Sequence, residues 1–339
     1  MKRTLAILIA LAMSVMMLTA CGSKDGTSGT PDNSGDANQT STGSYPGNKN
    51  ITLYCGYSAG GSSDTLCRLL AAKVGEKLGT TVTVENVTGA SGWVMWNQMM
   101  ESTKPDGYSF FLINSPNVTT GKYDPDNTMK YDQNDFEMIC NEVTDSNCLA
   151  IRVDDDRYSD WDSFAAYWKQ AGSLITSASG LGITSDDATA DMLVANDLGV
   201  DVDIIASGGS GDNVTFLLNG TTDFLMGNVS EMVAAHNDGQ FKILCVFAEE
   251  RDSNLPDVPT YEELTGNLVV GCSSRGYAML KDVPDDIKQI LGDAVKAAVQ
   301  DPDLIEQLNA IYTTTDYKEG QEYVDYMNQQ QQARETWGV

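Results

Sequence analysis

The chain has 339 residues, and its 48 acidic and 21 basic side chains give a formal net charge of −27 at pH 7. A charge of this size and sign argues against nucleic acid as a partner and against docking on anionic lipid through basic patches. Hydrophobic residues make up 41% of the chain, which is ordinary for a soluble globular protein. Because the length exceeds that of one small core, we expect two folded domains.

The N-terminus has the pattern of a lipoprotein signal peptide over residues 1–20. Lys2 and Arg3 precede an apolar run, Leu5 to Met17, which is too short for a membrane span. The Leu-Thr-Ala-Cys sequence that ends at Cys21 resembles the bacterial lipobox. This resemblance implies that Cys21 is acylated, with a plain secretory signal as the alternative. We therefore expect lipidation at Cys21 and a lipid anchor on the extracytoplasmic face of a bacterial cell membrane.

Residues 21–50 form the predicted linker between the anchor and the folded chain. The segment is rich in Gly, Ser, Thr, Asp and Asn, and Tyr45 is its only aromatic residue. Such a composition cannot offset the entropy of ordering the chain, so we expect a disordered tether. As a flexible coil it has a root-mean-square reach of roughly 30 Å.

The remaining chain alternates strand and helix patterns, which predicts an α/β fold with largely parallel sheets. The predicted helices span 63–78, 92–102, 161–170, 187–198, 213–219 and 229–237, and three more begin at Pro284, Pro302 and Glu319. The predicted strands span 51–55, 81–85, 109–113, 136–141, 149–153, 174–177, 202–206, 224–227 and 242–247.

Three loops that carry glycine and serine follow predicted strands and are the candidate binding loops. Ligands of open α/β sheets bind at the carboxyl ends of strands, where helix N-termini present free N–H groups. Glycine lets the backbone approach a ligand closely, although a single loop of this kind is usually only a turn. The residues are Ser58, Ala59, Gly60, Gly61, Ser62 and Asp64 in the first loop, Ser179, Gly180 and Gly182 in the second, and Gly208, Gly209 and Ser210 in the third.

Further polar residues stand near the same strand ends. Asn114 and Ser115 follow one predicted strand and Asn228 follows another, so each is either a ligand contact or a turn residue. Asp64 either accepts a ligand ammonium or satisfies free N–H groups in the first helix. Because the net charge opposes an anionic ligand, a carboxylate site would need strong local dipoles.

Cysteine and histidine usage gives no sign of a metal site, and we expect no metal and no cofactor. The six cysteines beyond residue 21 contain no Cys-x-x-Cys pair and no zinc spacing, and His236 is the only histidine. Cys55 and Cys245 lie in apolar runs and are expected to be buried. Cys140 and Cys148 flank a predicted turn and are the best candidates for a disulfide.

The sequence Gly56-Tyr57-Ser58-Ala59-Gly60 matches the Gly-x-Ser-x-Gly nucleophile elbow of serine hydrolases. A hydrolase would also need a histidine to take the serine proton. His236 closes the helix before strand 242–247, which places it at the sheet edge opposite Ser58. A serine hydrolase is therefore a remote alternative, and the sequence favours a binding protein that is not an enzyme.

Four distinct motifs stand out in the chain, three of them at short intervals between residues 60 and 108 and the fourth between residues 251 and 260. They are Gly60-Gly61-Ser62-Ser63-Asp64, Val84-Glu85-Asn86 with Gly89 and Gly92, Pro105-Asp106-Gly107-Tyr108, and Arg251 followed by Leu255-Pro256-Asp257-Val258-Pro259-Thr260. Together they are highly specific, and they resemble the extracytoplasmic solute receptors of the tripartite tricarboxylate transporter family, also called Bug receptors. The resemblance covers nearly all of residues 51–337.

The resemblance implies a two-domain, type II periplasmic-binding-protein-like fold with a ligand cleft between the domains and two hinge crossings. It implies that domain 1 comprises residues 51–149 and 247–339 and that domain 2 comprises residues 150–246. Main-chain N–H groups of the first loop and of its counterpart in domain 2 would hold a ligand carboxylate. The resemblance also places Arg275 near the site, with an ordinary salt bridge as the alternative role.

The chain departs from the family pattern at three points near the expected site. Ser58-Ala59 stands where prolines are usual, no histidine follows the second loop, where Ile183-Thr184 look inserted, and no tyrosine starts the third loop. The ligand alternatives are therefore citrate, another dicarboxylate, an amino acid or an aromatic acid.

The sequence thus predicts a monomeric, membrane-anchored receptor for a small organic solute, with a carboxylate as the expected ligand. Hinge closure would capture the solute, and the partners would be the integral membrane subunits of a tripartite tricarboxylate-type transporter. A ligand-binding lipoprotein that serves a sensor or adhesion partner shares every site feature and is the main alternative.

Overall fold

A computed structural model describes residues 45–120, 131–179 and 185–337 of the protein. The predicted signal peptide, Cys21 and most of the linker lie outside the described residues, as do Gly180 and Gly182. Within the described ranges, no helix is long and apolar enough to cross a membrane.

The first group of elements is built on a mixed sheet with the strand order β10-β4-β9-β3-β1-β2. In this sheet β1 pairs in parallel with β2 and β3, whereas β9 runs antiparallel to both β3 and β4, and β10 runs antiparallel to β4. The strands are β1 (Ile51–Cys55), β2 (Val82–Asn86), β3 (Ser109–Ser115), β4 (Glu137–Arg152), β9 (Cys272–Met279) and β10 (Thr315–Glu319).

Helices pack against this sheet, and α9 shows the apolar face through which such a helix is held. In α9, Leu291, Val295 and Val299 recur at four-residue spacing and are buried, which is the pattern of a helix with one face on a core. The helices of this group are α1 (Ser62–Leu78), α2 (Trp93–Ser102) with the short turn η1 (Ala90–Gly92) before it, α3 (Asn117–Thr120), α9 (Asp285–Val299), α10 (Pro302–Asn309) and α11 (Gly320–Trp337).

The second group of elements has its own buried clusters. Strands β5 (Ser173–Ser179) and β6 (Asp201–Ser207) form a parallel pair, while β7 (Leu225–Asn228) and β8 (Phe241–Val246) pair antiparallel with the C-terminal part of β4. The rings of Trp168 and Phe224 lie 4.8 Å apart between centroids in the aromatic centre of this core. The helices are α4 (Trp161–Ala171), α5 (Asp186–Leu198), α6 (Ser210–Leu218), α7 (Val229–Asn237) and α8 (Tyr261–Thr265).

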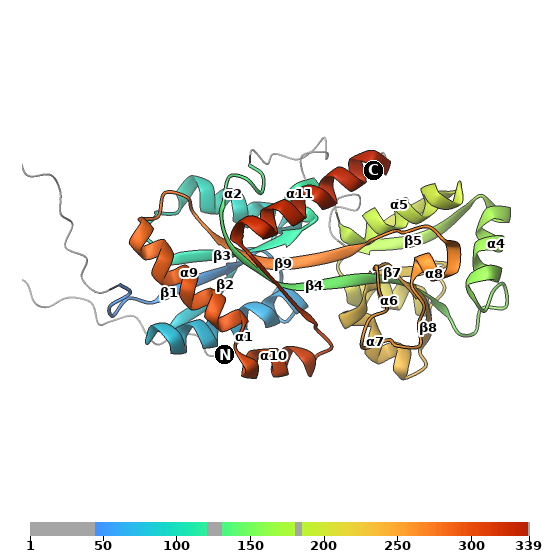
Figure 1. The fold of residues 1–339 in the computed structure, drawn as a ribbon. Helices are drawn as coiled ribbons and strands as arrows, with labels where there is room; N and C mark the ends of the chain where they lie inside the picture. Colours follow the sequence, from blue (N-terminus) through green and yellow to red (C-terminus); the bar gives the residue numbers. More distant parts are fainter. Residues whose placement is uncertain (1–44, 121–130, 180–184, 338–339) are drawn as a thin grey trace, which may run out of the picture. The chain divides into compact units, whose positions relative to one another are not determined.

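Two chain segments run from one group of elements to the other, and β4 is the first of them (Figure 1). Its N-terminal part pairs with β9 and β10, and its C-terminal part pairs with β7 and β8. The second segment returns through Gly271 into β9. A main-chain bond from Asn147 N to Gly271 O, 2.8 Å long, joins the two segments where they meet, and Gly271 N donates in turn to Phe247 O, just after β8, at 3.0 Å. The fold is therefore the two-domain, type II arrangement with two crossings that the sequence predicted.

The structure corrects several local expectations. The predicted strands 136–141 and 149–153 are parts of one 16-residue strand, β4, so no turn separates Cys140 from Cys148. Eight residues of extended chain put these cysteines roughly 25 Å apart, and both are free thiols, so the predicted disulfide is wrong. The sheets are also not largely parallel, because β4 and β9 run against their neighbours. Burial of Cys55 and Cys245 is confirmed, since neither is exposed.

Candidate functional site

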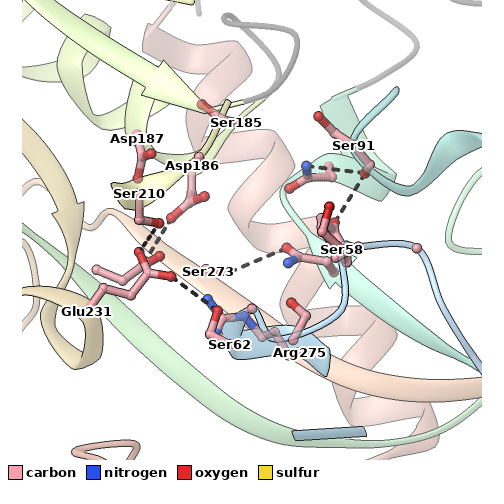
Figure 2. A pocket seen from close by; sticks show the side chains of 18 of the residues that line it. Ser58, Ser62, Ser91, Ser185, Asp186, Asp187, Ser210, Glu231, Ser273 and Arg275 are labelled. Carbon is pink, nitrogen blue, oxygen red and sulfur yellow. Dashed lines mark hydrogen bonds between the residues drawn. The ribbon is translucent and has the colours of Figure 1, made fainter. Parts of the chain in front are cut away.

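A cavity of about 320 Å³ lies at the ends of the strands that the sequence singled out (Figure 2). Its walls come from the segments after β1 and β2, from the end of β3 and the start of α3, from the starts of α5, α6 and α7, and from β9. The predicted site residues that line it are Ser58, Gly61, Ser62, Asn114, Gly208, Gly209, Ser210, Asn228 and Arg275. The structure therefore brings the first and third predicted loops together in one pocket.

Some of the other predicted residues do not line the cavity. Ala59 and Gly60 belong to the first loop and Ser115 ends β3, but none of them forms part of the wall. Ser179 ends β5. The start of α5 also lines the cavity, through Ser185, Asp186 and Asp187, whereas Gly180 and Gly182 of the second loop lie outside the described residues.

Asp64 has a structural role in the first loop. Its carboxylate accepts hydrogen bonds from Gly60 N, Arg68 Nε and Asn86 Nδ2, each at 2.8 Å. Burial opposes ionisation of Asp64, but the hydrogen bonds from Arg68, Gly60 and Asn86 outweigh it and lower the pKa of this carboxyl. Of the two roles that the sequence left open, the geometry favours the satisfaction of main-chain N–H groups.

The first and third loops are two copies of one local structure. Residues 60–64 and 208–212 both read Gly-Gly-Ser-x-Asp, and each helix begins at the serine with a glycine N-cap and no side-chain cap. In the second copy Asp212 Oδ2 accepts from Gly208 N at 3.0 Å, just as Asp64 accepts from Gly60 N. The uncapped first turns of α1 and α6 thus present main-chain N–H groups and positive helix-dipole ends to the cavity.

Glu231 joins the two loops through its carboxylate. It lies in the first turn of α7, where Oε1 accepts from Ser62 Oγ at 3.1 Å and Oε2 accepts from Ser210 Oγ at 2.5 Å (Figure 2). The sequence reasoning missed Glu231. The repeated Gly-Gly-Ser-x-Asp motif would have paired the two serines, but no local signal marks the acid that they share.

Arg275 on β9 is the cationic residue of the pocket. It is only 4% exposed, and among the described residues neither its Nε nor its Nη1 has a hydrogen-bond partner. It also forms no ion pair with any residue that the structure describes. Burial lowers the pKa of Arg275, but the carboxylates of Asp145, Glu231 and Asp186 outweigh that effect and raise it.

Amides hold the neighbouring carboxylates in place. Asp186 Oδ2 accepts from Asn147 Nδ2 and from Asn228 Nδ2, both at 2.9 Å. Behind Arg275, Asp145 accepts from the main chain and the hydroxyl of Ser230, and burial raises the pKa of Asp145 to about 6. Asn228, a predicted site residue, therefore both lines the cavity and positions an acid that also lines it.

His236 does not approach Ser58. Its Nδ1 accepts a hydrogen bond from Ile243 N at 3.2 Å at the C-terminal end of α7, and it is not part of the cavity wall. The described residues also contain no group of three or more His, Cys, Asp or Glu side chains arranged to hold a metal ion. The pocket therefore brings together hydroxyls, glycine loops, carboxylates and one guanidinium.

Two packed groups of elements, two crossings and a polar cavity between helix N-termini define the class of two-domain solute-binding proteins. The chain matches the family model described as tripartite tricarboxylate transporter family receptor over residues 66–337. It belongs to this family of extracytoplasmic solute-binding receptors, as the motifs predicted.

Individual relatives cover most of the chain. A UPF0065 protein from the gbd 5' region of Cupriavidus necator is 30% identical over 281 residues, which is 81% of this chain and 82% of that protein. The crystal structure of a TctC solute-binding protein from Polaromonas is 27% identical with a TM-score of 0.69 and covers 86% of this chain and 98% of its own. MatC from Rhodopseudomonas palustris, solved with bound malate, is 24% identical with a TM-score of 0.71 and covers the same shares, 86% and 98%.

Proposed function

We propose that the protein is a membrane-anchored receptor that captures a small organic carboxylate by hinge closure and delivers it to the integral membrane subunits of a tripartite tricarboxylate-type transporter. It acts as a monomer without a cofactor and carries out no catalysis, because Ser58 has no histidine within the pocket to activate it. Its place is the extracytoplasmic face of the cell membrane, where Cys21 carries the lipid anchor.

One observation carries this proposal: in a cavity between two uncapped helix N-termini lies a buried arginine whose Nε and Nη1 have no hydrogen-bond partner among the described residues. A guanidinium is always charged, and burying it without acceptors is costly. A ligand carboxylate would supply acceptors to Nε and Nη1 of Arg275. The first turns of α1 and α6 add N–H donors and dipoles of the same sign. Such a site binds an anion although the whole chain is strongly acidic.

The domain division is part of the proposal. The resemblance implied residues 51–149 and 247–339 for domain 1 and residues 150–246 for domain 2. We propose one change to this division: segment 247–271 goes with domain 2, because Phe247, Tyr261 and Val269 belong to the same buried cluster as Trp161. Ser62 and Glu231 then lie on opposite sides of the cleft, and their hydrogen bond is one of the contacts that hold the closed form. A ligand that contacts both sides stabilises closure by its differential affinity.

The receptor role is tested by calorimetry on Arg275→Ala with the tightest-binding acid from a thermal-shift screen. Affinity should fall roughly 10- to 100-fold, because a charge-assisted hydrogen bond contributes about 1.5 to 3 kcal/mol. Arg251→Ala is the matched control, since that arginine is exposed and pairs with Glu263 outside the pocket. Equal affinities for the Arg275 variant and the wild type would overturn the proposed site.

The anchor is tested separately by membrane fractionation of Cys21→Ser. This variant should leave the membrane fraction with an unchanged melting temperature, because the substitution lies ahead of the folded residues. Retention in the membrane fraction would contradict the proposed lipid anchor while leaving the binding site intact.

A further inference from the structure

We propose that the pocket selects a zwitterion, an α-amino acid or a close analogue, over the same acid without its amino group. Arg275 takes the ligand carboxylate, and the carboxylates of Glu231 and Asp186 take its ammonium. This inference rests on the receptor function proposed above and narrows the class of its ligand.

The charges on the cavity wall disfavour a dicarboxylate. Asp186, Asp187 and Glu231 line the cavity together with Arg275, so among the described lining residues three carboxylates face one cation. A dicarboxylate would bring two more negative charges against this excess, in a site where screening by water is reduced. A zwitterion adds no net charge, and it offers an ammonium to the carboxylates of the cavity wall and a carboxylate to Arg275. The pocket therefore matches a ligand with both charges better than one with negative charges alone.

The anionic part of the ligand follows from Arg275. This side chain is more than nine-tenths buried, lines the cavity, and has two nitrogens without a hydrogen-bond partner among the described residues. A purely cationic ligand would leave those donors unsatisfied and would add a like charge beside them. One carboxylate, placed at Arg275 near the start of α1, removes this cost.

The cationic part follows from the acceptors that remain on the opposite acids. Each oxygen of Glu231 accepts one serine hydroxyl, and an ionised carboxylate has about four lone-pair sites, so two remain. Asp186 uses Oδ2 for both of its amide donors, and its Oδ1 accepts no hydrogen bond from the described residues. An ammonium has three donors, which these free acceptors can take.

The two sides of the cavity differ in a way that fixes the ligand's orientation. Asp186, Ser210 and Glu231 lie together on one side in Figure 2, with Ser58 and Ser91 on the other. Every lining residue contributed by the chain before residue 120 is uncharged. An ammonium therefore has a partner on only one side, and the ligand side chain is directed toward the hydroxyl and amide groups of the other.

The experiment is titration calorimetry on the full chain with matched pairs of ligands that differ by one amino group. The pairs are aspartate and succinate, glutamate and glutarate, and alanine and propionate. In at least one pair the amino member should bind about tenfold tighter or more, because each charge-assisted hydrogen bond is strong in a partly buried site.

The variants Glu231→Gln and Asp186→Asn keep the side-chain shape and remove the charge. Each should lower the preference for the amino member roughly tenfold and leave the des-amino acid bound as well as before or more tightly. Glu306→Gln on α10 is the control for the change in net charge, since Glu306 is exposed and outside the cavity wall. Melting temperatures without ligand establish that every variant is folded.

The outcomes separate this inference from the receptor function. Tighter binding of the des-amino acids, with loss of that binding in Arg275→Ala, would overturn the zwitterion proposal and leave the carboxylate receptor standing. An unchanged preference in both acidic variants would also overturn it. Absence of binding by every member of all three pairs would overturn the receptor function and the zwitterion proposal together.

Discussion

The loops 60–64 and 208–212 share a sequence and a role, but the protein holds them very differently. In the first, Asp64 is 2% exposed and its carboxylate is fixed by Gly60, Arg68 and Asn86. In the second, Asp212 is exposed and Gly208 N is its hydrogen-bond donor. The first loop also opens a 17-residue helix, whereas the second opens one of nine residues.

One local motif can therefore form either a fixed or an adjustable part of the cavity wall. Short-range chemistry sets the turn, the helix start and the bond from the aspartate back to the glycine in both copies. The surroundings then decide how much energy is needed to move each loop. We therefore expect the first loop to be a fixed platform and the second to adapt when the ligand arrives.

The two loops differ most in the backbone conformation of the glycine that precedes each serine. Gly209 has φ +150°, whereas Gly61 has φ −78° and ψ 172°, an ordinary extended conformation. Gly209→Ala should lower ligand affinity roughly 5- to 100-fold, because a strained backbone costs about 1 to 3 kcal/mol unless Ser210 moves. Gly61→Ala should cost only a few-fold, although its Cβ would lie 3.3 Å from Ser58 O. Calorimetry measures the ligand affinity of both variants, and equal losses of affinity would show that the two loops are equivalent.

The aspartates test how firmly each loop is held. Asp64→Asn should lower the free energy of unfolding by about 1 to 3 kcal/mol, since it loses charge-assisted bonds at a buried site. Asp212→Asn should cost at most about 0.5 kcal/mol at its exposed position. The folded-state pKa of Asp64 is lowered, so its contribution is present above the unfolded pKa and is lost as pH falls through the folded one.

Urea unfolding of both variants at about pH 7 and about pH 3 is the measurement for the aspartates. The deficit of Asp64→Asn relative to wild type should shrink at the lower pH, where the wild-type carboxyl also becomes protonated. A deficit that is the same at both pH values, or a larger one for Asp212→Asn, would contradict the difference in anchoring.

Sequence reasoning found the parts of the site that depend on neighbours along the chain. The glycine loops after β1 and β6 are visible because turn residues and helix starts are local signals. Arg275 was placed by family resemblance, since β9 itself gives no strand pattern: Ser273, Ser274 and Arg275 are polar yet buried. Their burial depends on pairing with β3 and β4, which no local pattern reveals.

The absence of a local signal for tertiary pairing also explains the wrong turn predicted within β4 and the failure to predict Glu231. The stretch from Asn141 to Asn147 is rich in Asn, Asp, Ser and Thr, which favour turns, but there the chain is paired with β9 across the crossing. Glu231 and Ser62 are 169 residues apart in sequence and meet only in the folded protein. The hydrogen bond between these two residues is thus a property of the tertiary structure rather than of any local motif.

Substitution of the two serines should give the smallest effects, and it tests whether the two loops differ in the contacts that they make with Glu231. Ser62→Ala removes a 3.1 Å bond to Glu231 that joins the two proposed domains, whereas Ser210→Ala removes a 2.5 Å bond within domain 2. A single hydrogen bond contributes about 0.5 to 1.5 kcal/mol, so loss of the Ser62 bond should shift the closed-to-open ratio of the free protein roughly 2- to 10-fold toward the open form. Ser210→Ala should instead lower the melting temperature slightly and leave that ratio unchanged.

Small-angle scattering of the ligand-free variants measures the difference as a larger radius of gyration for Ser62→Ala alone. Equal radii for both variants would mean that the Ser62 bond does not hold the cleft closed, and that domain contacts elsewhere set the resting conformation.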